Sequence, residues 1–447
     1  MIKNIEISDS AALAIDVLTQ NGYSAYVVGG AVRDALIKRK TNDFDVATDA
    51  TPKDVIRVFS NFQVLLTGEK HGTVTVMLSE PIEITTFRTE GIYEDLRRPS
   101  NVEFISSLGE DLKRRDFTMN ALAYDGKGEI IDLYGGISDI NAKIIKTVGD
   151  PEKRFGEDAL RILRAVRFAS VLGFKIEENT LNAAIKLKSN LQAVSKERIF
   201  AELEKILQGE YVIDTLMNYS EIIFEIVPEL RPCYKFEQHI NRHKYDVYEH
   251  IVRSVGAVDN EKELRLAMFF HDSGKPQKFF IDENGIGHFY NHSEVSAAIT
   301  LDALKRLKAP NKLINEVVWL VANHHLYMKN DRIELKRLLS EHGEERIAAL
   351  LRVKCADCMA KGTDDAEQTS DEIKRIKNTI DEILRSGECL TVSDLAVGGD
   401  DLAELGFKGE SIGKILQVLL NDVICGNLPN ERERLIKSAK KRAEKYE

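Results

Sequence analysis

The stretch Tyr26-Val27-Val28-Gly29-Gly30-Ala31-Val32-Arg33-Asp34, followed by Asp43-Phe44-Asp45, decides the fold of the N-terminal part. Its apolar residues predict a strand over 24–29, and the residues after Gly-Gly predict a helix over 31–38. The second segment predicts a strand over 43–47, whose side chains alternate between the two faces. We therefore expect Asp43 and Asp45 on one face, where two hard oxygen ligands can hold Mg²⁺ beside phosphates, with Phe44 turned into the core.

The glycine pair fits the same chemistry. Gly29 and Gly30 lack Cβ atoms, so the backbone can approach a triphosphate closely, and the amides that open the next helix can bind an anion. Arg33 adds a charge-assisted contact. Either motif alone is often purely structural, because Gly-Gly usually marks a turn and Asp-x-Asp is common. In this order and spacing they predict a site for a metal-bound nucleoside triphosphate, and with it nucleotidyl transfer.

Composition limits the remaining possibilities. The 447 residues suffice for roughly two to four domains. The net charge of -10 means that any nucleic-acid surface must be local. No apolar run reaches the roughly 18 residues of a membrane-spanning helix, and acidic residues occupy the region where a signal peptide is apolar. Five scattered cysteines do not suggest a disulfide framework. We expect a cytoplasmic protein that does not associate with membranes.

The pattern along the chain predicts an α+β protein. A small mixed sheet is expected in a head at 1–150, because short β-rich segments alternate with helical ones there. After Asp150-Pro151 the strand signals stop, and amphipathic helices continue to the end. This all-α remainder is expected to comprise a neck, a central domain and a tail, at 151–225, 226–385 and 386–447. The other elements expected in the head are helices at 8–21 and 52–59 and strands at 64–66, 73–77 and 82–87.

Two further segments of the head suit nucleotide binding. Residues 113–121 place two guanidinium groups, a carboxylate and an amide close together, as binding to phosphates and a ribose hydroxyl requires. A surface turn before a helix is the alternative. Residues 88–99 are polar and charged, and they predict a mobile loop that could close over a substrate.

A helix is predicted over 155–168. Asp158, Arg161 and Arg164 follow at three-residue steps and would share one face of it. A rigid carboxylate and guanidinium can read the edge of a base, because one accepts and the other donates in a fixed plane. The alternative is an ion pair on a solvated face.

Five motifs in order over roughly residues 20–210 resemble those of class II tRNA nucleotidyltransferases, in the polymerase-β superfamily. They are Gly29 to Asp34 with Asp43-Phe44-Asp45, Arg114-Arg115-Asp116-Phe117-Thr118, Asp132 to Pro151, Glu157-Asp158-x-x-Arg161, and Lys196-Glu197-Arg198-Ile199. The resemblance implies a CCA-adding enzyme, which builds the 3′-terminal CCA of tRNA from CTP and ATP without a nucleic-acid template. Its implied partners are tRNA, ATP and CTP, and no protein partner is inferred.

The resemblance also implies roles for individual residues. Asp43 and Asp45 would bind Mg²⁺, and Asp116 would lie near the ribose. The triphosphate would be bound by Gly30, Arg33 and Arg115, and the base would be selected by Asp158 and Arg161 with support from Arg164 and Arg167. A third carboxylate is expected in this superfamily, and Glu83 is the candidate, unless it is simply an exposed strand residue. The intact end of the loop at 88–99 implies addition of the terminal adenosine as well as both cytidines.

A second group of residues begins after position 240. His250, His271-Asp272-Ser273-Gly274-Lys275, His292, His324-His325 and Asp357 resemble the HD superfamily of metal-dependent phosphohydrolases. The resemblance implies an HD domain at 226–385. The ligand set would be His250, His271, Asp272 and Asp357, which suits a divalent transition metal. Such a domain could be a phosphatase or 2′,3′-cyclic phosphodiesterase for tRNA ends, or it could be retained only as a scaffold for the tRNA stem.

The last segment contains Gly406 and Gly409, which predict a turn into a helix. The amides of that helix could hold a tRNA phosphate, although a plain helix-turn-helix connection explains the pattern nearly as well. Several functions remain open beside CCA addition. They are a partial CC-adding or A-adding enzyme, a poly(A) polymerase, a protein whose main activity is HD hydrolysis, and a non-catalytic RNA-binding protein.

Overall fold

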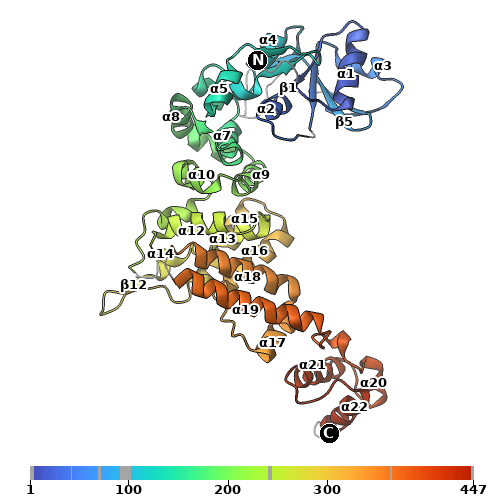
Figure 1. Cartoon of the computed structure of the whole chain (residues 1–447), viewed down its shortest axis with the longest axis vertical. Helices are drawn as coiled ribbons and strands as arrows, with labels where there is room; N and C mark the ends of the chain where they lie inside the picture. The colour runs from blue at the N-terminus through green and yellow to red at the C-terminus, as the bar shows by residue number, and fades with distance from the viewer. Residues whose placement is uncertain are drawn as a thin grey trace. The chain divides into compact units, whose positions relative to one another are not determined.

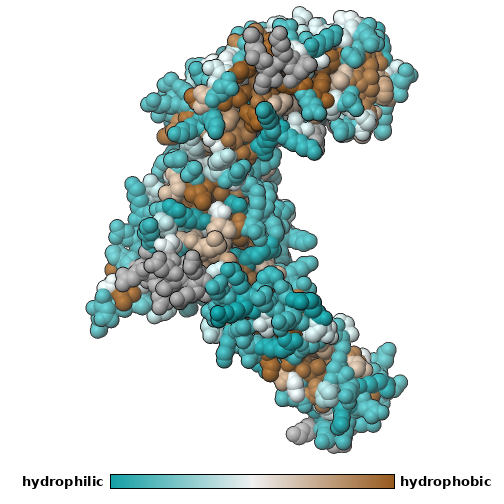
Figure 2. Space-filling view, viewed as in Figure 1, coloured by the Kyte–Doolittle hydropathy of each residue, from teal (hydrophilic) through white to brown (hydrophobic). Residues whose placement is uncertain are grey.

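The computed structural model describes residues 5–41, 43–68, 72–90, 102–239, 244–362 and 365–443. The chain folds into two compact units (Figure 1). The first unit is Met1–Pro228 with Arg306–Ala309, and the second is Glu229–Lys305 with Pro310–Glu447. Within the described ranges, none of the helices combines the length and the apolar character needed to cross a membrane. Hydrophilic side chains predominate on the face of the molecule in Figure 2.

A seven-stranded mixed sheet forms the head. Its order is β3 (Gln63–Gly68), β4 (Thr73–Met77), β5 (Pro81–Thr86), β2 (Asp45–Thr48), β1 (Ala25–Val28), β8 (Leu122–Tyr124) and β9 (Ile130–Asp132). Only the β2–β5 pair is parallel, and the other neighbours are antiparallel. The predicted mixed sheet is thus confirmed. In β4 the alternation places Val74 and Val76 in the core, both with 0% exposure.

Helices and a small β-ribbon complete the head. Helix α1 packs on β1, β2 and β5, and the Ser8 side chain caps its first turn. Helix α3 begins with a capping box between Thr51 and Asp54. The elements are α1 (Asp9–Gln20), α2 (Gly30–Leu36), α3 (Pro52–Val58), β6 (Arg88–Glu90), β7 (Val102–Phe104), α4 (Leu108–Lys113), the 3₁₀ turn η2 (Thr118–Asn120) and α5 (Gly136–Ala142).

Two of the predicted elements are wrong in detail. Strand β2 begins at Asp45, so Asp43 lies in the segment before it and not in the strand, although Phe44 is buried as predicted. The single helix over 155–168 is in fact two, α6 (Pro151–Glu157) and α7 (Leu160–Leu172). Asp158 lies at the break in extended conformation, with φ -139° and ψ 106°. Its carboxylate accepts a hydrogen bond from the N–H of Leu160 (3.0 Å), which favours a new helix start over continuation.

The rest of the first unit is mostly helical, and α7 packs along α9. The expectation that strands end at residue 150 is wrong at one point, because β10 (Ile144–Ile145) pairs in parallel with β11 (Lys175–Ile176). The helices that follow are α8 (Glu178–Leu187), α9 (Lys196–Leu207), α10 (Val212–Asn218) and α11 (Ser220–Ile226), with the 3₁₀ turn η3 (Lys188–Ala193). A further 3₁₀ turn, η4 (Pro228–Cys233), begins at the last residue of this segment and belongs mostly to the second unit.

The residues of the second unit that the structure describes are helical or irregular apart from one short hairpin. It pairs β12 (Phe280–Ile281) with β13 (Gly287–His288), and the sequence did not predict it. Its central helices are α12 (Val247–Ala257), α13 (Lys262–Phe270), α14 (Lys275–Lys278), α15 (His292–Arg306), α16 (Asn311–Asn323), α17 (Arg332–His342), α18 (Glu344–Met359) and α19 (Asp365–Arg385). Helices α12, α13, α16 and α18 pack against one another.

The last helices of the unit surround a core that includes Leu402, Leu419 and Leu435, each with 0% exposure. They are η5 (Val392–Asp394), α20 (Gly399–Glu404), α21 (Glu410–Ile424) and α22 (Arg432–Ala443). The predicted glycine turn is confirmed, because Gly406 (φ 94°) and Gly409 (φ 54°) connect α20 to α21. All five cysteines are free thiols.

Candidate active site

A pocket of about 520 Å³ in the first unit is lined by all the predicted nucleotide-binding residues and by the predicted Mg²⁺ ligands Asp43 and Asp45. It is formed by the start of α2, the segment before β2, the turn after α4, and helices α7 and α9. Its lining residues are Gly29, Gly30, Arg33, Asp43, Asp45, Arg114, Arg115, Asp116, Asn120, Asp158, Leu160, Arg161, Arg164, Arg167, Phe168 and Arg198.

The glycine pair shapes one wall of the pocket. Gly29 has φ +75°, a backbone conformation that residues with a Cβ rarely adopt. A Cβ at this position would also lie 2.8 Å from a guanidinium nitrogen of Arg115. The position therefore favours glycine for its backbone conformation, and a Cβ there would displace the guanidinium of Arg115. Gly30 opens α2, so the first amides of that helix lie at the edge of the pocket.

Three carboxylates lie near the start of β2. Asp43 is exposed, Asp45 is partly buried, and Glu83 on β5 is the register partner of Asp45 in the parallel pair. Burial, with the negative charges of Asp43 and Glu83, raises the pKa of Asp45 to about 6, although Arg115 opposes the shift. Carboxylates crowded in this way favour a bound cation, and their oxygens are ligands that Mg²⁺ prefers.

The arginines that face these carboxylates are held by contacts on their other side. Arg33 donates from Nη1 to Asn120 Oδ1 (2.6 Å) and pairs with Asp34 (2.8 Å). Arg115 pairs with the buried Asp111 at 3.4 Å, and burial lowers the pKa of its guanidinium. Fixed guanidinium groups can bind phosphate oxygens with little loss of side-chain freedom.

Asp116 makes an ion pair across the pocket with Arg164, at 2.6 Å. Burial alone would raise the pKa of Asp116, but the Arg164 charge and the hydrogen bond from Asn120 Nδ2 (3.0 Å) hold it well below its usual range. The same charge of Asp116 raises the pKa of Arg164. The carboxylate is therefore ionised and fixed in orientation.

The expectation that Asp158, Arg161 and Arg164 share one helix face is wrong, because the chain breaks at Asp158. Asp158 pairs instead with Arg198 on α9 (2.9 Å). The guanidinium of Arg161 pairs with Glu157 (2.6 Å) and donates to the backbone oxygens of Arg154 and Arg114, at 3.2 and 3.3 Å. Asp158 and Arg161 nevertheless line the same pocket.

Arg198 and Phe168 line the pocket although neither was assigned a site role from the sequence. Arg198 belongs to one of the five motifs, and this was the only sequence signal for it. The guanidinium carbons of Arg33, Arg164 and Arg167 lie 5.0, 5.6 and 4.5 Å from the centre of the Phe168 ring. Arg167 also pairs with Glu202 at 3.1 Å. The ring thus orders three cations at the pocket wall, and no local pattern marks it as different from a core aromatic.

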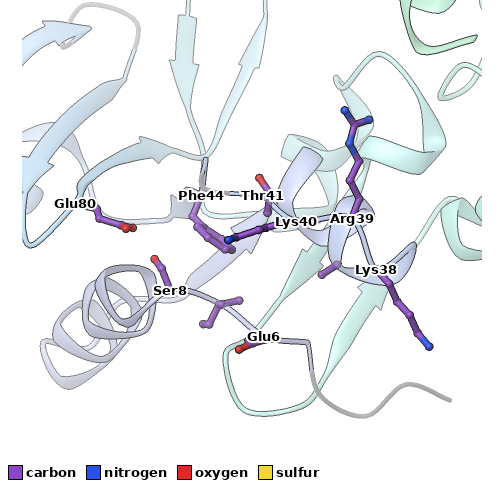
Figure 3. A pocket seen from close by; sticks show the side chains of 10 residues that line it. Glu6, Ser8, Lys38, Arg39, Lys40, Thr41, Phe44 and Glu80 are labelled. Carbon is purple, nitrogen blue, oxygen red and sulfur yellow. The ribbon is translucent and has the colours of Figure 1, made fainter. Parts of the chain in front are cut away.

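A second pocket in the first unit, of about 550 Å³, lies beside the end of α2 (Figure 3). Its basic residues are Lys38, Arg39 and Lys40, all exposed. Figure 3 shows Lys38 and Arg39 extending in different directions while Lys40 lies beside Phe44. These groups do not converge as the arginines of the first pocket do, so we assign the nucleotide site to the first pocket.

The predicted HD ligands come together in the second unit. His250 Nε2 lies 3.2 Å from His271 Nε2, 3.0 Å from Asp357 Oδ1 and 3.3 Å from Asp272 Oδ2. Burial alone would raise the pKa of Asp272, but the charges of His271 and Lys275 hold it well below its usual range. Imidazole and carboxylate groups in this arrangement suit a divalent transition metal.

Three further histidines lie beside this cluster. His292, His324 and His325 form a second group of potential ligands with Asp272, whose donor atoms all lie within 4.8 Å of one another. The sequence places them in the HD pattern, but the predicted ligand set omits them. The sequence shows that these histidines occur at intervals typical of the HD pattern. It does not show that they converge on Asp272, because that depends on how α13, α15 and α16 are arranged.

Comparison with known proteins identifies the family. The Poly A polymerase head domain model matches residues 25–146, the model for an RNA and SrmB-binding site of polymerase A matches residues 173–232, and the model for tRNA nucleotidyltransferase domain 2 matches residues 288–439. A CCA-adding enzyme of Geobacillus sp. (strain WCH70) is 35% identical over 425 residues, 94% of each chain. The chain belongs to the CCA-adding enzyme family.

Other members of the family match over nearly the full length. The CCA-adding enzyme of Enterococcus faecalis is 34% identical over 440 residues. The aligned region spans 98% of this chain and 97% of the Enterococcus faecalis protein. The crystal structure of the Bacillus stearothermophilus CCA-adding enzyme in complex with CTP superposes with a TM-score of 0.72 at 31% identity. That match covers 98% of this chain and 97% of the other. The fold class predicted from sequence is confirmed by this match.

Proposed function

We propose that this protein adds the 3′-terminal CCA to tRNA from CTP and ATP, without a nucleic-acid template, by Mg²⁺-dependent nucleotidyl transfer in the cytoplasm. The observation that carries the proposal is the pocket in which Asp43 and Asp45 face fixed arginines beside a glycine pair. A protein that only binds RNA has no need of crowded carboxylates. The full-length relatives named as CCA-adding enzymes favour this reaction over poly(A) synthesis.

The reaction joins the tRNA 3′-hydroxyl oxygen to the α-phosphorus of the nucleotide, and the hydroxyl gives up its proton to solvent. As that bond forms, the bond from the α-phosphorus to the oxygen bridging it to the β-phosphorus breaks, and pyrophosphate leaves with the electron pair. Mg²⁺ held by Asp43 and Asp45 would neutralise charge on the phosphates. Glu83 is our candidate for the third carboxylate, because it lies in register beside Asp45. Arg33, Arg115 and the amides at Gly30 would bind the triphosphate.

We propose that the base is selected by Asp158 and Arg161. A template made of protein must hold its donors and acceptors still, and these side chains are fixed by Arg198 and Glu157 respectively. Arg164 and Arg167 would support them through contacts with Asp116 and Phe168. The oriented carboxylate of Asp116 would lie near the ribose.

We propose a domain arrangement for tRNA binding as well. The head (1–150) and the neck (151–225) would hold the nucleotide and the acceptor end. The HD domain (226–385) and the tail (386–447) would contact more distant parts of the tRNA. The turn at Gly406 and Gly409 presents the amides of α21 to solvent, and these could hold a phosphate.

The test uses tRNA transcripts that end before CCA, with Mg²⁺ and CTP alone, ATP alone, or both, and products resolved to single nucleotides. We expect growth by two residues with CTP and by three only with both. The implied role of the loop at 88–99 in adenosine addition concerns residues that lie mostly outside the described ranges, so this assay must decide it. Growth limited to two residues indicates a partial enzyme, long adenosine tails indicate a poly(A) polymerase, and no growth contradicts the proposal.

A second activity is favoured by the histidine cluster of the second unit. We propose that His250, His271, Asp272 and Asp357 bind a divalent transition metal and that the domain hydrolyses phosphoesters at tRNA ends. Water would supply the oxygen that joins the phosphorus, and the ester oxygen would leave with a proton. The bound ion would polarise the phosphoryl group.

The hydrolase is tested with 2′,3′-cyclic nucleotides and phosphomonoesters in the presence of Mn²⁺ or Ni²⁺. Asp272→Ala should abolish hydrolysis and leave CTP incorporation intact, because Asp272 lies outside the nucleotide pocket. Asp45→Asn is the matched control, with the opposite pattern expected. If Asp272→Ala and wild type hydrolyse the substrates equally, the domain is a scaffold.

A further inference from the structure

The hairpin of the second unit carries aromatic side chains on both of its faces. Its inner face packs into the unit, because the ring centroid of Phe279 lies 5.2 Å from that of Phe236 and 5.3 Å from that of Phe289. The backbone is fixed as well, since the N–H of Gly287 donates to the carbonyl oxygen of His239 at 2.9 Å. The hairpin therefore has a defined outer face, and Figure 1 shows it extending beyond the helices of this unit.

Three rings lie together on that outer face, and we call Phe280, His288 and Tyr290 the hairpin platform. The ring centroid of His288 lies 5.1 Å from that of its cross-strand partner Phe280 and 5.3 Å from that of Tyr290. The plane of His288 differs from the planes of these two neighbours by only 24° and 19°. Asp282 pairs with His288 at 2.8 Å and holds its ring in place.

The platform is open to solvent. Phe280 is 46% exposed and Tyr290 is 66% exposed. Contacts between rings on neighbouring strands stabilise a short hairpin. They do not require that most of the Tyr290 side chain remain in water, so hairpin stability alone does not explain this surface.

The platform lies next to the histidine cluster along the chain. Tyr290 precedes His292 by two residues, so their Cα atoms are at most about 7 Å apart. On the other side of the cluster, Tyr327 follows His325 by two residues and is 76% exposed. The ring centroids of His292 and His325 lie 4.8 Å apart. The two segments that carry exposed tyrosines therefore meet at the cluster.

The segment that carries Tyr327 is also held in place. Lys354 Nζ donates to the backbone oxygens of His324 and Leu326, at 3.2 and 2.9 Å. The N–H of Leu326 donates to the backbone oxygen of Asn323 at 2.7 Å. A ring on a fixed segment can bind a ligand with little loss of backbone freedom.

The chemistry of these surfaces fits an unpaired base of RNA. Nearly parallel rings match the flat face of a base, and aromatic side chains on which bases stack are a common means of binding single-stranded RNA. Exposed lysines lie two residues from a ring in each segment, Lys278 before Phe280 and Lys329 after Tyr327, and can contact the phosphates between bases. The position beside a cluster proposed to act on phosphoesters favours a nucleotide over a protein chain.

We propose that the hairpin platform and Tyr327 stack the unpaired bases at the 3′ end of an RNA and thereby present its terminal phosphate to the histidine cluster. The inference rests on the hydrolase proposed above and assigns its substrate class. The preferred substrates are unpaired RNA ends of any base, because stacking uses a face that every base has, and small phosphoesters without a base are poor substrates.

Photochemical crosslinking locates the bases without depending on hydrolysis. The probe is a short single-stranded RNA that ends in 4-thiouridine 3′-phosphate, irradiated with the chelator-treated full-length protein, and the adducts are mapped by mass spectrometry. We expect adducts at Tyr290 and Tyr327. Neither residue lines the nucleotide pocket of the first unit, so these adducts cannot arise there.

Steady-state hydrolysis then measures the contribution of stacking. The substrates are the same RNA with a terminal uridine 3′-phosphate and glycerol 2-phosphate, which has no base. Tyr290→Leu should raise the KM for the RNA by about tenfold without changing kcat, whereas Tyr290→Phe keeps the ring and should retain the wild-type KM. Neither substitution should change kcat/KM for glycerol 2-phosphate.

Tyr211→Leu is the matched control, because it removes an exposed tyrosine (41%) of the first unit, and it should leave all these values unchanged. Trp319 is the only tryptophan and lies on α16, so its fluorescence verifies that the second unit of each variant is folded.

The outcomes separate this inference from the proposed hydrolase. Adducts at both tyrosines, with a KM raised by Tyr290→Leu for RNA alone, support the inference. The same adducts without hydrolysis of either substrate overturn the hydrolase and leave the RNA surface standing. Hydrolysis with adducts confined to the first unit, or with equal KM values for wild type and Tyr290→Leu, overturns this inference alone. A wild-type dimer in sedimentation that Tyr290→Leu converts to a monomer also overturns it, because the platform then binds a second copy of the chain.

Discussion

Replacement of Asp45 by asparagine should stabilise the metal-free head at neutral pH while abolishing nucleotide transfer. The pKa of Asp45 is raised from 3.8 to about 6 by burial and by the charges of Asp43 and Glu83. The folded head therefore holds this proton more tightly than the unfolded chain does. The contribution of Asp45 to the stability of the metal-free head is therefore fully present below about pH 4 and is lost as the pH rises from about 4 to 6. Above that range the ionised carboxylate destabilises the fold.

The size of the effect follows from the shift. Roughly two pKa units at about 1.4 kcal/mol each give an upper limit of about 3 kcal/mol. Asp45 keeps some contact with solvent, so we expect about 1–2 kcal/mol. Asp45→Asn removes the charge and keeps the shape, and should recover this amount at pH 7. Near pH 4 the gain should vanish, because Asp45 is then protonated in the folded wild type.

The measurement must report on the head alone. Tryptophan fluorescence is unsuitable, because Trp319 lies in the second unit. Hydrogen exchange of peptides from β1 and β2, in the presence of a chelator, gives the opening free energy of the head directly. Asp16→Asn is the matched control, because this exposed residue on α1 undergoes the same substitution without the burial of Asp45. Mg²⁺ should stabilise the wild type more than Asp45→Asn. Equal or faster exchange of Asp45→Asn at pH 7 would refute the reasoning.

Two further substitutions test the pocket. Gly29→Ala and Gly22→Ala both place a Cβ at positive φ (75° and 86°), and each should cost about 1 kcal/mol of stability. Only the Cβ at position 29 approaches Arg115, so only Gly29→Ala should raise the KM for CTP and ATP, by tenfold or more. Equal KM values for the Gly29→Ala and Gly22→Ala variants in steady-state assays would contradict this. Arg164→Met leaves the buried Asp116 without its cation and should lower stability by about 2 kcal/mol, part of it regained when Asp116→Asn is added. Urea unfolding that shows no recovery in the double variant would exclude this explanation.

The regular elements of the head were predictable because their signals are local. The alternation in Thr73-Val74-Thr75-Val76-Met77 predicts β4 with both ends correct. The helix break at Asp158 was not predictable from periodicity, since the apolar pattern continues through it. There the Asp158 carboxylate accepts a hydrogen bond from the amide of Leu160, the first residue of the new helix. Side-chain capping of this kind competes with helix propensity at one residue, and a pattern averaged over several turns does not detect it.

The chemistry-bearing residues of the site were predictable, but most of their partners were not. Asp43 and Asp45 are recognisable because paired carboxylates after a glycine turn have few structural uses. The partner of Asp158, in contrast, is Arg198, 40 positions away. The spacing within one helix suggested Arg161 instead. Only the packing of α7 against α9 decides between these partners, and that packing depends on long-range contacts.

The net charge of the chain says little about the charge of its nucleotide site. The chain carries a net charge of -10, yet seven arginines and four aspartates line the nucleotide pocket of the first unit. Part of that positive charge is offset from behind, where Asp111, Glu157 and Glu202 pair with pocket arginines. These acidic partners fix the guanidinium groups in orientation and reduce their mutual repulsion while the site is empty of nucleotide. An anionic triphosphate then meets cations that are already ordered, so less side-chain freedom is lost on binding. The acidic residues that make the chain negative overall are thus, in part, what allows so many arginines to converge on one pocket.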